Sequence, residues 1–290
     1  MSEAQLALIG DLHASWDDAD TDYFNASRYE LLLFTGDLGS SGPRNGVSVA
    51  RSLARLSRPA LVMLGNNDAA EYARISAELR YRQGRELLLR GLESRAPAAP
   101  SSSVRACGLD AHRFEVAGLA FTVIAGRPFA MGNSELSSPA ALRASYGVAS
   151  LEECRTRLFA LVDGADTEHL IFLAHNGPSG LGAESDAPWG RDFHPDAGDW
   201  GDDDLEAAVA HARATGRRVL AVVAGHMHWR LRGGGLRRWY TTQDDTLYVN
   251  AARVPRAVRS QGALVCHHCA LTLSPARAEV REIAVERSED

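Results

Sequence analysis

Aspartate, histidine and asparagine side chains recur directly after short apolar runs of this sequence. The residues of this kind are Asp11, His13, Asp37, Asn66, His175, His226 and His228. Mixed oxygen and imidazole ligands suit divalent first-row metals such as Mn, Fe, Zn or Co better than Ca²⁺ or Mg²⁺. A carboxylate shared by two such ions would let them clamp the attacking and leaving oxygens of a phosphoryl group, and Asp37 is the natural bridge. The sequence therefore predicts a two-metal hydrolytic site.

The apolar runs that precede these residues have the length and composition of buried parallel strands. They cover residues 4–9, 30–35, 60–64, 169–173 and 219–223. Helical spacing or composition predicts helices at 47–56, 69–92, 151–162 and 204–214. In an open α/β sheet the loops at the carboxyl ends of the strands converge on one crevice. We therefore expect the seven side chains to lie close together.

The remaining segments predict a second set of strands within one domain. Residues 95–103 hold two prolines and read as a linker between its halves. Strands are expected at 104–107, 113–116 and 120–124, the last two forming a hairpin across Gly118. Alternating stretches at 246–249, 263–273 and 279–285 are expected to complete a second sheet.

Composition excludes several classes of function. The chain has 290 residues, 45% hydrophobic and 23% charged, with no apolar run long enough to span a bilayer. A net charge of −6 gives no global attraction for nucleic acid. Four scattered cysteines predict reduced thiols, and the amino-terminal residues lack the pattern of a signal peptide. We expect a cytoplasmic protein that acts on a small substrate.

The order of the motifs resembles the calcineurin-like metallophosphoesterase superfamily. The motifs are Asp11-x-His13, Gly36-Asp37, Gly65-Asn66-x-Asp68, His175 and Gly225-His226-x-His228. The resemblance implies an α/β fold of two facing mixed β-sheets flanked by helices, and the chain length is that of one large domain over residues 1–290. It also implies that Asp11, His13, Asp37 and His228 hold one metal, and that Asp37, Asn66, His175 and His226 hold the other. The stretch from Asn176 to Asp202 is similar to a branch found in cyanobacteria and plants.

Asn67 stands where this family usually has a histidine that protonates the leaving oxygen, paired with the acidic residue matching Asp68. Asparagine cannot donate a proton, although its amide can hydrogen-bond a phosphate oxygen. The sequence therefore predicts a preference for diesters or for esters with acidic leaving groups. Alternatively, His112 or His194 supplies the proton, or Asn67 is an introduced substitution that traps a ligand. For Asp68, capping of a helix that starts at Ala69 is an equally good interpretation.

Substrate contacts are expected from a long loop after His175. Residues 176–204 are predicted to form a lid or a substrate wall, with Arg191 and His194 as contacts. Packing by Trp189 and Trp200 is the alternative explanation for this loop. Arg127 follows another strand and is a second candidate for phosphate binding.

Three functional classes compete for this chain. The first is a dinuclear phosphoesterase in which a metal-bridging hydroxide attacks phosphorus in line, with Asn67, Asp68 and His175 taking part. The second is a phosphomonoesterase or phosphoprotein phosphatase with another proton donor. The third is a metal-binding scaffold without activity, against which the complete ligand set argues.

Overall fold

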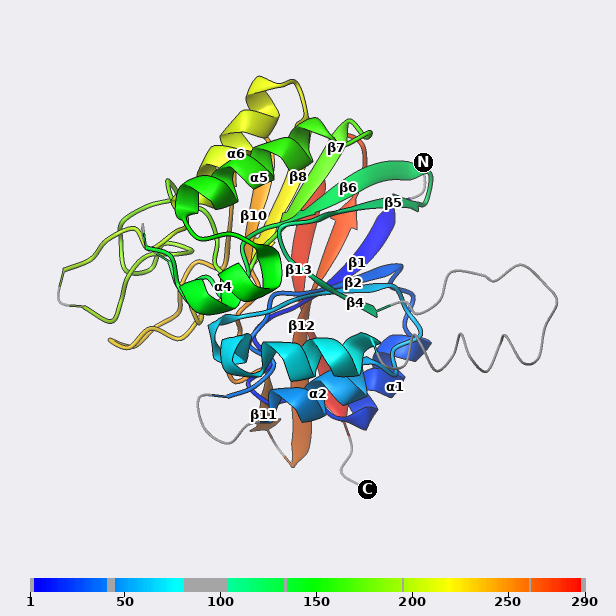
Figure 1. Cartoon of the computed structure of the whole chain (residues 1–290). Helices are drawn as coiled ribbons and strands as arrows, with labels where there is room; N and C mark the ends of the chain where they lie inside the picture. The colour runs from blue at the N-terminus through cyan, green and yellow to red at the C-terminus, as the bar shows by residue number, and fades with distance from the viewer. Residues whose placement is uncertain are drawn as a thin grey trace.

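Two mixed β-sheets pack face to face in the computed structural model, which describes residues 3–40, 45–80, 104–132, 135–194, 196–260 and 262–287 (Figure 1). The first sheet has the order β11-β12-β1-β2-β3-β4, with β13 paired to β12. Its strands are β1 (Ala4–Ile9), β2 (Leu31–Phe34), β3 (Ala60–Met63), β4 (Val104–Cys107), β11 (Ala257–Ser260), β12 (Ala263–Leu273) and β13 (Ala278–Arg287). Strands β1 to β4 run parallel, whereas β11, β12 and β13 join antiparallel.

The second sheet has the order β5-β6-β7-β8-β10-β9. Its strands are β5 (Ala111–Val116), β6 (Leu119–Ala125), β7 (His169–Leu173), β8 (Arg218–Ala224), β9 (Tyr240–Gln243) and β10 (Thr246–Asn250). Strands β6, β7, β8 and β10 are parallel, and β5 and β9 pair antiparallel at the edges.

Side chains of the central strands alternate between two apolar cores. Leu6 and Leu8 of β1 point into the core between the sheets, whereas Ala7 and Ile9 point into the core that holds the helices. Phe172 and Leu173 of β7 divide in the same way. Because successive side chains of a strand face opposite sides, a strand covered on both faces must be apolar throughout.

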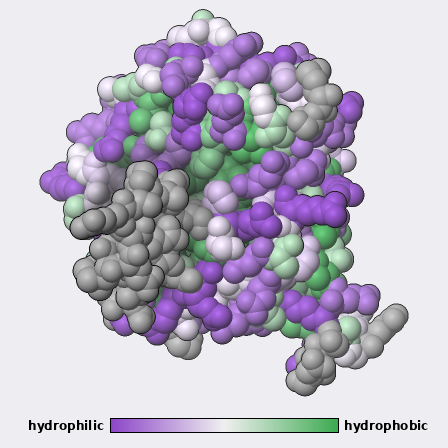
Figure 2. Space-filling model, turned by 90° about the vertical axis from the view of Figure 1, so that its right-hand side faces the viewer, coloured by the Kyte–Doolittle hydropathy of each residue, from purple (hydrophilic) through white to green (hydrophobic). Residues whose placement is uncertain are grey.

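Helices cover the outer faces of the sandwich (Figure 1). Helices α1 (Asp18–Ala26) and α2 (Gly46–Leu53) lie on the first sheet, and α5 (Leu151–Asp163) and α6 (Asp203–Ala214) lie on the second. A shorter helix, α4 (Pro139–Tyr146), and a 3₁₀ helix, η1 (Asn66–Glu71), complete the named helices of the described residues. The face shown in Figure 2 is mostly hydrophilic, with hydrophobic side chains in patches.

The predicted strands that precede the ligand-type residues are confirmed to within one residue at each end. The hairpin across Gly118 is also confirmed, because Val116 of β5 pairs with Leu119 of β6. Ala117 and Gly118 both have positive φ, as a two-residue turn of this kind requires.

Two predictions about the fold need correction, and one helix with a clear capping signal was not predicted. The last strands do not share one sheet: β10 joins the second sheet, whereas β12 and β13 extend the first. The helix expected over 69–92 is instead η1 followed by a helix over 72–80, and its remainder lies outside the described residues, as does the 95–103 linker. Helix α1 was not anticipated, although Asp17 and Asp20 form a reciprocal capping box at its start.

No helix within the described part of the chain is long and apolar enough to cross a bilayer.

Candidate metal centre

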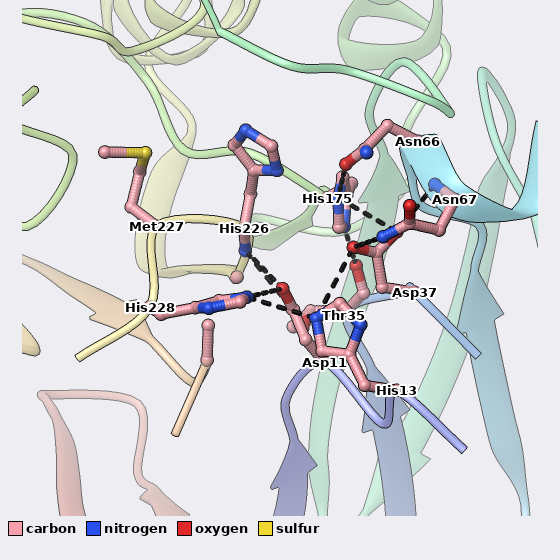
Figure 3. A network of polar contacts seen from close by, with 12 residues as sticks. Asp11, His13, Thr35, Asp37, Asn66, Asn67, His175, His226, Met227 and His228 are labelled. Atoms are coloured by element: carbon pink, nitrogen blue, oxygen red, sulfur yellow. Dashed lines mark hydrogen bonds and ion pairs between the residues drawn. The ribbon is translucent and has the colours of Figure 1, made fainter. Parts of the chain in front are cut away.

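All seven predicted ligands come together where the parallel strands of the two sheets end (Figure 3). Their potential ligand atoms form two groups. The first group is Asp11, His13 and His228, and the second is Asp37, His175 and His226, with atoms within 4.8 Å of one another in each. Asn66 joins the second group, because its Oδ1 lies 2.9 Å from His175 Nε2.

The first group is organised around the buried carboxylate of Asp11. His228 Nε2 lies 3.6 Å from Asp11 Oδ2 and 3.1 Å from His13 Nε2. The backbone N–H of His226 donates to both Asp11 oxygens at 3.1 and 3.2 Å. The Thr35 hydroxyl donates to Asp11 Oδ1 at 3.3 Å. Asp11 is therefore held in orientation by groups of the loops that follow β2 and β8.

The second group contains hydrogen-bond acceptors that face one another. His175 Nδ1 lies 2.8 Å from the backbone carbonyl of Thr35, which can only accept, so the proton of the neutral ring is on Nδ1. The unprotonated Nε2 then faces Asn66 Oδ1 at 2.9 Å and Asp37 Oδ1 at 3.5 Å. Three electron-pair donors directed at one another in a buried site fit a bound cation, and the Thr35 carbonyl is the outer partner that metal-binding histidines commonly have.

Asp37 lies between the two groups. Its Oδ2 is 3.8 Å from His13 Nε2 of the first group, and its Oδ1 is 3.5 Å from His175 Nε2 of the second. This position agrees with the predicted bridging role.

The loops that carry the ligands have unusual backbone geometry. His13, Asp37 and His226 have φ of 42°, 47° and 68°, a left-handed conformation that costs a side-chain-bearing residue about 1–3 kcal/mol. Gly65 and Gly225 leave the space that the ligands occupy: a Cβ would lie 2.2 Å from Asp37 Oδ1 at position 65 and 2.2 Å from Asp11 Oδ1 at position 225. The glycines of the motifs are thus explained by close approach to the carboxylates.

Burial and mutual charge perturb the ionisation of the site. Burial raises the pKa of Asp37. Burial also acts to raise the pKa of Asp11, but the hydrogen bond with His228 and the nearby histidines lower it overall. Burial lowers the pKa of His226 to about 3, so this imidazole is neutral near pH 7, as a metal ligand must be.

Asn67 donates to Asp37 rather than pointing into solvent. Its backbone N–H donates to Asp37 Oδ1 at 2.9 Å, and its side-chain amide donates to Asp37 Oδ2 at 2.7 Å (Figure 3). Asn67 also lines the cavity above the two groups. It can therefore turn an N–H toward a phosphoryl oxygen, while the proton expected from a histidine has no source at this position.

Asp68 serves the backbone of the loops. Its buried carboxylate accepts from the N–H groups of Gly65, Leu38 and Gly39 at 2.9, 3.2 and 3.2 Å. The predicted N-cap role of Asp68 is wrong, because η1 starts at Asn66 with Gly65 as its N-cap residue, and Asp68 is the N3 residue whose carboxylate accepts from the Gly65 N–H. Burial and the charge of Asp37 raise the pKa of Asp68 to about 7.

Arg127 does not lie where it could bind phosphate, so its predicted role as a phosphate contact is wrong. It is 3% exposed and donates to Asp202 Oδ1 at 2.9 Å and to Asp204 Oδ2 at 3.0 Å. Its remaining bond also goes to Asp204, and it is not among the cavity-lining residues. The guanidinium is thus used inside the protein, where it ties β6 to the start of α6.

The other predicted substrate contacts also lie outside the cavity wall. Arg191 donates to carbonyls of its own loop and lies over the Trp200 ring at 5.5 Å. His194 has a side chain that is 53% exposed and sits beside Asp196. His112 lies on β5 and faces Asp110 at 3.2 Å, so neither histidine is placed to replace Asn67 as proton donor.

The loop over 176–204 is anchored along its described residues. Trp189 is buried and its indole N–H donates to the Gly225 carbonyl at 3.0 Å. Arg237, buried beneath the loop, donates to the carbonyls of Ser185, Ala187 and Gly190. These contacts favour a fixed substrate wall over a movable lid for this loop. The packing of Trp189 is one of the contacts that hold the loop in place.

Several cavity-lining residues were missed in the sequence. The cavity has a volume of about 610 Å³, and its lining includes Met131, Glu135, Phe193, Arg230 and Arg232 as well as five of the candidate ligands (His13, Asp37, Asn66, His226 and His228). Arg230 and Arg232 follow His228 at spacings of two and four residues. This proximity could have suggested that they lie near the site, but arginines are common throughout the sequence. Phe193 and Met131 gave no signal, because only folding places them at the mouth of the site.

Comparisons with known proteins agree with this geometry. Residues 4–230 match the family described as calcineurin-like phosphoesterase. One solved crystal structure is 11% identical, covers 97% of this chain and 99% of its own, and has a TM-score of 0.56, a likeness of fold.

Two other solved structures align along most of the chain, but with low TM-scores. A metallophosphoesterase from Sphaerobacter thermophilus is 15% identical over 98% of this chain and 89% of its own, with a TM-score of 0.30. Chaetomium thermophilum Vps29 is 10% identical over 99% and 96%, with a TM-score of 0.27. No curated protein matches the chain. The family match spans most of the sequence and contains every candidate metal ligand, so this chain belongs to the calcineurin-like phosphoesterase family.

Proposed function

We propose that this protein is a dinuclear metal-dependent phosphoesterase that favours phosphodiesters and other esters with good leaving groups. The observation that carries the proposal is the pair of ligand groups joined at Asp37, with an asparagine beside them where a general acid would stand. Two divalent ions of the Mn, Fe, Zn or Co type would fit these ligands and would lower the pKa of a bound water and neutralise phosphate charge.

The protein residues have distinct tasks in this reaction. His175 is oriented by the Thr35 carbonyl, and Asp11 by the His226 N–H, so the ligands need little rearrangement. The Asn67 amide can move from Asp37 to a phosphoryl oxygen and orient the substrate. Such positioning lowers the barrier without proton transfer.

The preference for good leaving groups follows from the lack of a free histidine among the described residues that line the cavity. Among the described lining residues, every histidine belongs to one of the two ligand groups. General acid catalysis contributes about 10²–10⁴ in rate, mostly for poor leaving groups such as alkoxides. An ester with an acidic leaving group needs no such help.

Asn67→His tests the missing proton donor. With Mn²⁺ present, kcat for an alkyl phosphate monoester should rise by about 10²-fold or more, whereas kcat for a p-nitrophenyl diester should change little. The matched control is Glu135→Gln, which removes the unassigned carboxyl of the wall. No rise in the histidine variant, or a collapse of alkyl ester hydrolysis in the glutamine variant, would show that the reasoning about the proton is wrong.

A metal-binding scaffold without activity is the alternative, and metal analysis combined with a screen for ester hydrolysis separates the two. A two-metal enzyme purified without chelators should retain more than about one divalent ion per chain, and Asp37→Ala should lower the content of both ions because the carboxylate is shared. Stoichiometric metal without hydrolysis of any ester would support the scaffold.

A further inference from the structure

The cavity is larger than a phosphoryl group requires. Its volume of about 610 Å³ falls within the range of about 300–1,000 Å³ that holds small organic ligands. The metal-ligand groups occupy its floor, so the remaining wall must contact the rest of the substrate. The chemistry of that wall indicates what the ester group carries.

One side of the cavity is apolar and exposed. Met131, Phe193 and Trp200 form this apolar wall. Met131 is 46% exposed and Phe193 is 39% exposed, two of the five large hydrophobic side chains that are this exposed in the described part of the chain. Exposed apolar groups gathered at a cavity beside candidate catalytic residues indicate a binding surface.

The apolar wall is held in place before any ligand binds. The Trp200 indole N–H donates to the Met131 carbonyl at 2.6 Å, and the Trp200 carbonyl accepts from Asn176 at 2.9 Å. Gly132 permits this contact, because a Cβ there would lie 2.3 Å from the Trp200 ring. Phe193 meets Trp200 edge to face, with ring centroids 5.1 Å apart. A rigid wall binds a flat group at low entropic cost.

Positive charge lies next to the apolar wall. Arg232 lies 5.6 Å above the Phe193 ring, and both Arg230 and Arg232 line the cavity. No carboxylate of the described residues pairs with either guanidinium, whereas Asp192 beside them is paired with Arg237 at 3.2 Å. Guanidinium planes stack on aromatic rings and attract phosphate, so this corner suits a group that is both flat and attached to an anion.

We propose that the apolar wall and Arg232 bind a planar aromatic ring carried by the phosphate ester, making Phe193 a specificity-determining residue. The inference rests on the proposed function for the position of the phosphate at the two ligand groups. The ring can be bonded to phosphorus through one oxygen, as in an aryl ester, or carried by a sugar, as in a nucleotide. Both present the same flat π surface to the wall.

The test measures binding to the metal-loaded protein by calorimetry. Phenylphosphonate is compared with methylphosphonate, and uridine 5′-monophosphate with ribose 5-phosphate. Wild-type protein should bind the aromatic member of at least one pair about tenfold more tightly, a factor typical of one stacked ring, and the pair that shows it identifies the source of the ring.

Phe193→Ala is the informative variant, because this side chain is exposed and its loss should leave the fold intact. It should abolish most of the tenfold preference while changing the affinity for the non-aromatic ligands by less than about twofold. Phe193→Leu should keep only part of the preference, and Leu236→Ala, an exposed residue outside the cavity lining, should keep all of it.

Two results would overturn the inference: no aromatic preference in the wild-type protein, or equal losses for both members of a pair in Phe193→Ala. Hydrolysis of p-nitrophenyl diesters, measured on the same samples, separates this failure from failure of the proposed function. Hydrolysis without a Phe193-dependent preference rejects only the aromatic site. A Phe193-dependent preference without hydrolysis of any ester rejects only the enzyme.

Discussion

Replacing Arg127 with methionine tests whether this arginine stabilises the fold or binds phosphate. The side chain is 3% exposed and makes three hydrogen bonds to two buried carboxylates. Burial alone would lower its pKa, but Asp202 and Asp204 raise it above the ordinary value for arginine. The structure therefore places a buried cation between the buried carboxyl groups of Asp202 and Asp204.

The expected loss of stability in Arg127→Met depends on the buried carboxylates that lose their partner. Removing one partner of a buried ion pair typically costs about 3–5 kcal/mol, because the remaining charge stays buried. For a domain of this size, about 2 °C of thermal midpoint is lost for each kcal/mol, so the midpoint should fall by about 6–10 °C. Asp204→Asn added to Arg127→Met should recover part of this loss, because it removes one of the uncompensated charges.

The assay combines thermal unfolding with kinetics measured well below the midpoint. The KM for a phosphate ester should stay within about twofold of wild type, since Arg127 does not line the cavity. Arg127→Lys is the control: it keeps the charge but lacks the planar fork, so its midpoint should lie between those of methionine and wild type. A large increase in KM with an unchanged midpoint would show that Arg127 binds phosphate.

The remaining predictions concern the pH dependence of stability and the glycines of the site. Burial raises the pKa of Asp202 to about 7, so its contribution to stability is complete below the unfolded pKa near 3.8 and is lost as the pH rises through about 7. As the pH rises from about 4 to about 7, the wild-type protein should therefore lose stability relative to Asp202→Asn in urea unfolding, and a parallel pair of pH profiles over this range would contradict this. Gly65→Ala places a Cβ 2.2 Å from Asp37 Oδ1 and 2.6 Å from His175 Cε1, and should reduce bound metal severalfold, whereas Gly233→Ala, in open space, should not. Normal metal content in Gly65→Ala would mean that the loop can shift at little cost.

The strands and the grouping of the candidate metal ligands could be predicted because their signals are local. Each ligand follows an apolar run that ends at a glycine-containing turn, and β7 and β12 have the predicted bounds. The parallel strands within each sheet bring such turns to one edge, and the packing of the two sheets then brings the two edges together. The assignment of β12 and β13 to the first sheet was missed because strand pairing between distant segments leaves no local pattern.

The roles of the arginines likewise depend on contacts between distant segments rather than on the local sequence. In the sequence, Arg127 and Arg191 look as suitable for phosphate as Arg230 and Arg232, since each lies near a strand end or in a long loop. Packing decides among them: Asp202 and Asp204 enclose Arg127, whereas Arg230 and Arg232 remain at the cavity. From the sequence, Asp68 could equally have faced the substrate or the backbone. In the structure its carboxylate accepts hydrogen bonds from three backbone N–H groups of two loops.

The sequence by itself determined the family, the candidate ligand residues, the order of the strands that precede them, and the asparagine at position 67. These features depend on residue type and on spacing along the chain, which are visible without folding. Only the tertiary structure decided which charges are buried in pairs, that Asn67 donates to Asp37, and that Phe193 and Trp200 meet at the cavity. Those properties depend on distances between residues far apart in the chain, and the packing of two sheets and their loops sets those distances.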